Sequence, residues 1–113
     1  MTKDDLPYLQ HIKICLERIE QYAAVGRDAF SKDTKTQDAI LRNLQTMAEA
    51  TQKLSASLKT KHPEVPWTKL SGFRNILVHN YLGLNMDRIW DVVEKNVPEF
   101  KQQFATAFRD HGI

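Results

Sequence analysis

Apolar side chains recur at steps of three and four residues along most of this chain, and this spacing constrains its fold more than any other feature. The first series comprises Leu9, Ile12, Leu16, Ile19 and Ala23, and the second comprises Ile40, Leu44, Met47, Thr51, Leu54 and Leu58. Positions three and four apart share one face of an α-helix. No segment alternates apolar and polar residues as a half-buried strand does. The sequence therefore predicts an all-α fold.

Glycine and proline mark the boundaries between the predicted helices. Each occurs only four times, and both favour turns and helix ends. We predict a first helix from Asp4 or Asp5 to Ala24, a connection containing Phe30, a second helix from about Thr36 to Thr60, a third that is capped by Thr68 or Ser71 and ends by Gly83, a fourth from Asn85 or Asp87, and a fifth from Pro98. Together they form one domain, residues 1–113, folded as a four- to five-helix up-and-down bundle.

Composition narrows the class of protein further. The hydrophobic share is 42%, which supports a modest core, and a core of this size often gains stability from dimerisation. No apolar run approaches the roughly 20 residues that span a bilayer, and we find no signal peptide. The one cysteine, Cys15, has no partner for an internal disulfide and lies among core positions. We therefore expect a cytoplasmic protein with a buried Cys15 and no membrane segment.

The segment from Arg74 to Tyr81 carries the candidate chemistry. It places Arg74, Asn75, His79 and Tyr81 within eight positions of a predicted helix. Arginine is a permanent cation that holds a phosphate through two parallel hydrogen bonds. Histidine accepts and returns a proton near neutral pH. Arg74 and His79 together are therefore a minimal set of groups for cutting RNA without a metal.

Helix geometry separates the two candidate groups. At about 100° per residue, Arg74 and His79 point about 140° apart, whereas Asn75 and His79 share a face. We assign Phe73, Ile76 and Leu77, with Leu70, to the core side. Val78 and Leu82 then fall on the side facing water, which indicates a second buried surface. A twofold homodimer through this helix accounts for that surface and brings both copies of Arg74 and His79 to one cleft.

Positive charge is concentrated around the same segment. Residues 50–86 contain the cations Lys53, Lys59, Lys61, Lys69 and Arg74 and the single acid Glu64, a local net charge of +4. The whole chain has a net charge of only +2. A local excess of this sign attracts phosphates, although a chance surplus of surface lysines is the simpler alternative.

Structural roles remain open for several of these residues. Arg74 is also suited to an ion pair with Glu49 or Asp91, and His79 to a hydrogen-bonded place in the core. Asn75 suits an interface amide as well as a supporting catalytic role, and Tyr81 suits the rim of the core. Two tryptophans, Trp67 and Trp90, are expected in the core. The remaining histidines, His11, His62 and His111, lack the spacing of metal ligands, so we expect neither a metal nor a cofactor.

The motif and its surroundings resemble the HepT family of HEPN-domain toxins. The resemblance rests on His62-Pro63-Glu64-Val65-Pro66-Trp67, Leu70-Ser71-Gly72-Phe73-Arg74-Asn75, His79-Asn80-Tyr81 and Trp90, and on Tyr8-Leu9, Phe30, Gln37-Asp38-Ala39, Arg42-Asn43-Leu44 and Glu49-Ala50 upstream. It extends over roughly residues 8–108. One departure is Asn85, which stands where relatives commonly have Asp but can still cap the next helix.

The resemblance implies a function. HEPN ribonucleases cut RNA without metal at a composite dimeric site. Here Arg74 would bind the scissile phosphate, His79 would act as acid or base for attack by the 2′-hydroxyl, and Asn75 would orient the imidazole or the phosphate. HepT-like toxins are typically paired with an MntA-type nucleotidyltransferase antitoxin, which transfers AMP from ATP onto the tyrosine of the motif, here Tyr81. The added phosphates would compete with RNA for Arg74.

Two other classes of function remain open from the sequence. The first is a non-catalytic helical module that binds a nucleotide or docks onto a nucleotidyltransferase, for which His79 would be dispensable. The second is a structural dimer in which the motif only closes the interface. Toxicity of the chain expressed alone, relieved by His79→Ala, separates the ribonuclease from both.

Overall fold

The computed structural model describes residues 4–113, and every regular element in that part of the chain is helical. The α-helices are α1 (Leu6–Ala23), α2 (Arg27–Lys32), α3 (Thr34–Gln52), α4 (Ala56–Lys61), α5 (Trp67–His79), α6 (Met86–Asp91) and α7 (Val97–Asp110). A 3-10 turn, η1 (Tyr81–Gly83), precedes α6, and a π-helical turn, η2 (Val92–Asn96), follows it. The predicted all-α fold is confirmed.

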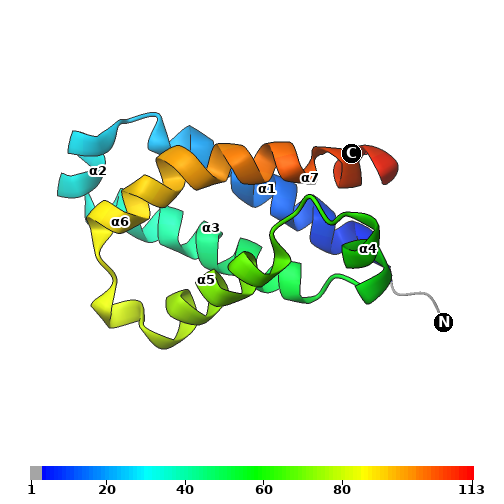
Figure 1. Cartoon of the computed structure of the whole chain (residues 1–113). Helices are drawn as coiled ribbons and strands as arrows, with labels where there is room; N and C mark the ends of the chain where they lie inside the picture. Colours follow the sequence, from blue (N-terminus) through cyan, green and yellow to red (C-terminus); the bar gives the residue numbers. More distant parts are fainter. Residues whose placement is uncertain (1–3) are drawn as a thin grey trace.

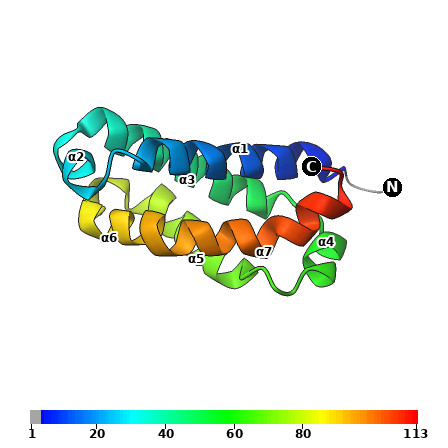
Figure 2. The ribbon, with the colours of Figure 1, turned by 90° about the horizontal axis from the view of Figure 1, so that it is seen from above.

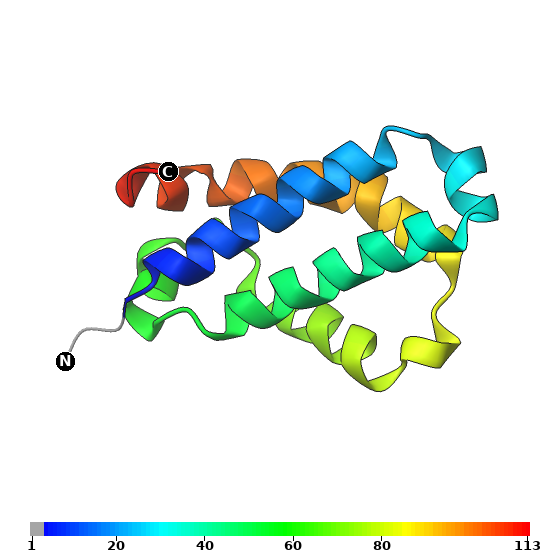
Figure 3. The same cartoon turned by 180° about the vertical axis from the view of Figure 1, so that it is seen from behind.

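Four long helical segments run in alternating directions along the molecule (Figures 1 and 2). They are α1, α3, α5 and the continuous segment from α6 through η2 to α7. Helix α3 lies in the middle and packs against α1 on one side and α5 on the other, as the view from behind also shows (Figure 3). Helix α7 packs against α1. Helix α5 therefore has its main support from α3, and it lies at the edge of the bundle.

The second predicted helix is wrong as a single element. The chain leaves the helical path after Gln52 and starts α4 at Ala56. Ser55 causes this start, since its hydroxyl accepts a hydrogen bond from the backbone N–H of Leu58 at 3.2 Å. The carboxylate of Asp5 then accepts hydrogen bonds from the N–H and the hydroxyl of Ser55, at 2.8 and 2.6 Å. Asp5, predicted as a cap of its own helix, thus holds the start of α4 against the start of α1.

The connection after α1 is also more ordered than predicted. It forms the short helix α2, which places Phe30 in the core against the ring of Trp90, with a centroid distance of 5.1 Å. Gly26 precedes α2 with φ +90°, a backbone conformation that favours glycine. From the sequence, Gly26 indicated only a turn at this point. The short helix is explained by the burial of the Phe30 ring.

The two C-terminal helices were predicted as separate, and this prediction is wrong. Helix α6 starts where expected, with the Asn85 side chain accepting from the N–H of Asp87 at 2.9 Å. It then continues through η2 into α7, and Pro98 lies in the first turn of α7. Proline lacks an N–H and cannot complete a regular α-helical ladder. The wide turn of η2 carries the chain past this point without a break.

The core contains the residues that the apolar spacing predicted. Every member of the two series is buried except Ala23, which is half-buried, and Cys15 is buried with them. Burial raises the pKa of the Cys15 thiol. Trp90 is buried as expected, whereas Trp67 is half-buried and packs edge-on against Phe104. No helix within residues 4–113 is both long and apolar enough to cross a membrane.

Candidate functional site

Helix α5 carries most of the motif, and it begins earlier than predicted. Its first residue is Trp67, directly after Pro66, and no side chain caps it. The predicted cap Ser71 lies one turn inside and donates a hydrogen bond to the Gln52 side chain on α3, at 3.0 Å. Trp67 donates its indole N–H to the carbonyl of His62, at 3.0 Å. The entry to α5 is therefore fixed by tertiary contacts rather than by a local cap.

Arg74 is half-buried on the side of α5 that faces α3. Its Nη1 donates to the side-chain oxygen of Asn75 at 3.1 Å, and its Nε is buried without a hydrogen-bond partner. With Glu49, Gln52 and Lys53 of α3 it lines a cavity of about 280 Å³, which we call the Arg74 hollow.

Neither structural ion pair considered for Arg74 forms. Within residues 4–113 no carboxylate lies within 4.0 Å of its guanidinium, and Asp91 instead pairs with Arg27 at 4.0 Å. In the described part of the chain, the guanidinium is held only by its neighbour Asn75. Its remaining N–H groups are thus available to an anion.

His79 is the last residue of α5 and is exposed. Its side chain makes no hydrogen bond or ion pair within the described part of the chain. The interpretation of His79 as a satisfied core histidine is therefore wrong. Asn75 accepts a hydrogen bond from Arg74, and its expected role of orienting the imidazole or the phosphate stays a prediction.

Tyr81 lies outside the helix. Helix α5 ends at His79, and Tyr81 opens the 3-10 turn η1 rather than the last turn of the α-helix. Its side chain is 45% exposed, so it does not occupy the core rim. The following residue, Leu82, is completely exposed at 100%. The turn therefore presents a tyrosine and a leucine to solvent side by side.

The outward face of α5 is formed by Gly72, Asn75, Ile76 and His79, all of which are exposed. Their spacing of three, one and three residues places them on one side of the helix. Ile76 was assigned to the core, and this is wrong, since it is 53% exposed. Val78, expected on the water side, is half-buried. The apolar surface near the motif is therefore provided by Ile76 and Leu82.

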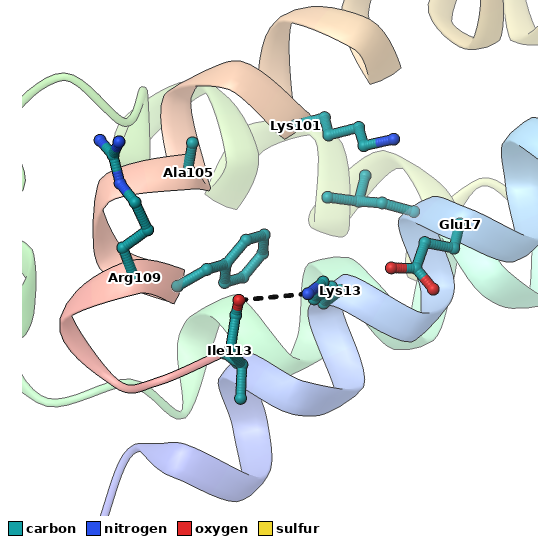
Figure 4. A pocket seen from close by; sticks show the side chains of 8 residues that line it. Lys13, Glu17, Lys101, Ala105, Arg109 and Ile113 are labelled. Carbon is teal, nitrogen blue, oxygen red and sulfur yellow. Dashed lines mark hydrogen bonds between the residues drawn. The ribbon is translucent and has the colours of Figure 1, made fainter.

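Several further cavities lie outside the Arg74 hollow, among them one between α5 and α6 and one between α1 and α7. The larger, about 780 Å³, runs between α5 and α6 and is lined by Phe73, Ile76, Asn80, Gly83, Leu84, Asn85, Arg88, Ile89, Asp91 and Val92. A smaller one of about 250 Å³ lies between α1 and α7, where Lys13 donates to the carbonyl of Ile113 at 3.2 Å (Figure 4). No motif residue lines the second cavity, which is separate from the candidate site.

The basic residues near the motif divide into two groups. Lys59 lies over the ring of Trp67, 5.8 Å from its centroid, and Lys61 pairs with Asp110 at 3.8 Å. Lys53 and Lys69 are exposed and make no such contact within residues 4–113. Of these, Lys53 lines the Arg74 hollow. The local positive charge thus includes one lysine directly beside Arg74.

Sequence reasoning missed one polar cluster. His62 is only 2% exposed; its Nδ1 lies 3.1 Å from the Glu64 carboxylate and its Nε2 3.4 Å from that of Asp110. The histidine joins the segment before α5 to the end of α7. The sequence shows that His62 and Glu64 are two positions apart, but it gives no signal that Asp110 lies close to them. No group of three or more potential metal ligands occurs within residues 4–113.

The geometry defines a class of protein: a small helical domain that carries Arg74 and His79 on one helix and Tyr81 in the turn that follows it. A family model described as HepT-like ribonuclease matches residues 12–107. The chain belongs to the HepT-like ribonuclease family.

Individual relatives agree with this assignment. A candidate RNase of Caldanaerobacter subterraneus subsp. tengcongensis is 35% identical over 102 residues, covering 89% of this chain and 91% of the relative. A probable ribonuclease HepT of Thermococcus cleftensis is 31% identical, with 92% and 96% covered. An mRNA nuclease HepT of Shewanella oneidensis is 30% identical, with 80% and 86% covered. No solved structure matches the chain.

Proposed function

We propose that this protein is a toxin ribonuclease that cuts RNA without a metal ion, at a composite site formed by a homodimer. The observation that carries the proposal is the arrangement of α5. Arg74 has a buried Nε beside a lysine, and within residues 4–113 neither this Nε nor the exposed His79 side chain has a partner. Two groups of this kind, with no role in stabilising the fold, are typical of a site that acts on a phosphate.

The division of chemistry between the two residues follows from their properties. Arg74 would hold the non-bridging oxygens of the scissile phosphate and stabilise the charge that grows on them during attack. His79 would transfer a proton to or from the reacting oxygens. Attack by the neighbouring 2′-hydroxyl yields a 2′,3′-cyclic phosphate and a 5′-hydroxyl, so DNA would not be cut.

A dimer is part of the proposal because one chain separates the two groups. Arg74 and His79 point about 140° apart around α5. The outward face of α5 carries exposed Ile76, and the adjoining turn carries exposed Leu82. Pairing two such faces about a twofold axis would cover both apolar side chains and place two copies of the motif together.

We further propose that a nucleotidyltransferase antitoxin of the MntA type neutralises the protein by adding AMP to Tyr81. The exposure of Tyr81 and its position in a 3-10 turn after α5 support access by an enzyme. A phosphodiester on its hydroxyl would bring negative charge close to the motif. That charge would compete with RNA for Arg74 and thereby suppress cleavage.

The test is RNA cleavage by purified protein in excess EDTA. Cleavage that leaves cyclic phosphate ends is expected, and Arg74→Ala and His79→Ala should each reduce the rate by about 10²-fold or more. His111→Ala is the matched control, because His111 contacts the carbonyl of Ala107 near the far end of the bundle. Strict dependence on Mg²⁺, or full activity in His79→Ala, would point instead to a non-catalytic module that docks on a nucleotidyltransferase.

A further inference from the structure

We propose that Glu49 is the general base of the reaction, the group that removes the proton from the attacking 2′-hydroxyl. This inference rests on the proposed ribonuclease function and adds a residue to its site. Glu49 lies on α3, outside the motif, and shares the Arg74 hollow with Arg74, Gln52 and Lys53. A carboxylate in this position needs an explanation, because an anion beside a phosphate-binding arginine opposes phosphate binding unless it takes part in the chemistry.

Glu49 has no role in holding the fold together. Its side chain is half-buried, yet it makes no hydrogen bond or ion pair within residues 4–113. Other acidic residues of this protein do have structural roles. Asp5 accepts a hydrogen bond from the Ser55 N–H at the start of α4, and Asp33 accepts one from the Lys35 N–H at 3.1 Å. A half-buried carboxylate without a partner loses hydration and gains nothing in return. Its position is therefore better explained by a ligand than by stability.

Two cationic side chains that line the hollow also have groups without a partner within residues 4–113. The Nε of Arg74 is buried with no hydrogen bond, and Lys53 is exposed and unpaired in the described chain. Two cations and one carboxylate give the hollow a net positive charge. A phosphate oxygen entering the hollow would satisfy the Arg74 N–H groups, and the cations would offset its repulsion from Glu49.

The reaction requires two proton transfers, one from the 2′-hydroxyl and one to the leaving 5′-oxygen. Glu49 would take the proton of the 2′-hydroxyl as the 2′-oxygen forms a bond to phosphorus. The bond from phosphorus to the 5′-oxygen would break, and the leaving 5′-oxygen would take a proton from a His79 imidazolium of the composite site. The products are a 2′,3′-cyclic phosphate, a 5′-hydroxyl, a protonated Glu49 and a neutral His79. Exchange with water restores both groups.

The primary test is Glu49→Gln, which keeps the shape of the side chain and removes the basic oxygen. The value of kcat/KM should fall by about 10²- to 10⁴-fold. Binding of an uncleavable RNA with a 2′-methoxy group at the cleavage position should be at least as tight, because the hollow has lost a negative charge. Glu99→Gln is the matched control, since Glu99 is exposed at the start of α7.

Two readouts separate a base from a binding residue. The acidic limb of the pH–rate profile should disappear in Glu49→Gln and remain in Glu49→Asp, which keeps a carboxylate and also serves if the Gln variant does not fold. An RNA with sulfur in place of the 5′-bridging oxygen has a leaving group that departs without a proton. This substrate should restore cleavage by His79→Ala but not by Glu49→Gln.

The outcomes distinguish this inference from the proposed function. If the wild-type protein cuts RNA and depends on His79, but Glu49→Gln keeps its rate and pH profile, Glu49 is not the base. A loss confined to KM with an unchanged pH profile gives Glu49 a role in RNA binding only and also overturns the inference. Absence of cleavage by the wild-type protein contradicts the proposed function itself.

Discussion

Arg74 and Asn75 are adjacent residues whose side chains are joined by a hydrogen bond of 3.1 Å, so that the amide holds the guanidinium. Side chains at successive helix positions point about 100° apart, and such a contact requires the long arginine side chain to bend toward its neighbour. Asn75 thereby limits the rotation of a cation that has no other partner within residues 4–113. We expect this restraint to prepare Arg74 for phosphate binding.

Replacing Asn75 by Ala should therefore reduce cleavage without unfolding the protein. A hydrogen bond to a charged group contributes about 1.5–3 kcal/mol, so kcat/KM should decrease by roughly ten- to a hundredfold. The variant should keep the wild-type circular dichroism spectrum and melting temperature, because Asn75 is exposed. Wild-type cleavage rates in this variant would assign Asn75 to the interface instead.

A second prediction at a single residue concerns the hydroxyl of Tyr81. Tyr81→Phe removes only an exposed hydroxyl, so the variant should fold and cut RNA like the wild type. Incubated with the partner nucleotidyltransferase, ATP and Mg²⁺, the wild-type protein should gain AMP-sized mass and lose activity, whereas Tyr81→Phe should do neither. Tyr22→Phe is the control variant, since Tyr22 lies on α1. Inhibition of the wild type without any mass gain would indicate that the partner acts by forming a complex.

Helix α5 differs from the other long helices because one side of it is left without a partner. Its support comes mainly from α3, and its outward face exposes Gly72 and Ile76. An exposed isoleucine followed by a fully exposed leucine, six residues later and in the adjoining turn, is unusual for a small monomer. We therefore expect the outward face of α5 to form a dimer interface.

Changing Ile76 and Leu82 together to Glu should produce monomers. An interface of about 1,200–2,000 Å² would be needed for a stable dimer, and two buried carboxylates would prevent it from forming. Light scattering after size-exclusion chromatography measures the mass, and RNA cleavage should be lost although Arg74 and His79 remain. Ile14→Glu is the matched control, because Ile14 is similarly exposed, at 44%, but lies on α1. A fully active monomer would contradict the composite site.

Replacing Gly72 by Ala should stabilise the folded monomer and weaken the dimer. A Cβ at Gly72 would meet no atom within 4 Å in the single chain, so the fold does not require glycine there. In the monomeric Ile76→Glu, Leu82→Glu background, Gly72→Ala should raise the free energy of unfolding by about 0.5–1 kcal/mol. In the otherwise wild-type chain it should weaken the dimer, measured by sedimentation, because the added methyl group would lie on the proposed interface. An unchanged dimer would place the contact elsewhere along α5.

At one end of the molecule, the buried His62 connects two segments that are far apart in the sequence. Its two ring nitrogens face Glu64 and Asp110, and Asp110 also pairs with Lys61. These contacts connect the segment before α5 to the end of α7, although about 46 residues separate them in sequence. The hydrogen bond from the backbone N–H of Glu64, with the bond and charge of His62, lowers the pKa of the Glu64 carboxyl.

This lowered pKa gives the protein an acid-sensitive component of stability. A carboxyl with a lower pKa in the folded state stabilises the fold above its ordinary pKa of 4.5, and that contribution is lost as the pH falls below it. Melting temperatures measured by circular dichroism should therefore decrease between pH 5 and pH 3, and less steeply in Glu64→Gln. Glu99→Gln should keep the wild-type slope. Equal slopes in all three proteins would remove Glu64 from this explanation.

The sequence by itself determined the all-α class, most of the buried positions of α1 and α3, and the motif. This was possible because helical spacing and the chemistry of Arg74 and His79 are local properties. Family similarity agrees with the ribonuclease class assigned from the same residues. The core positions of α1 and α3 needed no information beyond the three- and four-residue steps.

Tertiary structure alone decided where helices are interrupted or joined and which side chains meet. The break before α4 depends on Asp5, fifty residues away, and one ion-pair partner of the buried His62, Asp110, lies at the end of α7. Ile76 is exposed because α5 packs mainly on α3, which the apolar side chain of Ile76 does not reveal. The meeting of Glu49 and Arg74 in one hollow likewise follows from the packing of α3 on α5. Contacts between distant segments have no local signal, since they depend on how whole helices pack rather than on the spacing within any one of them.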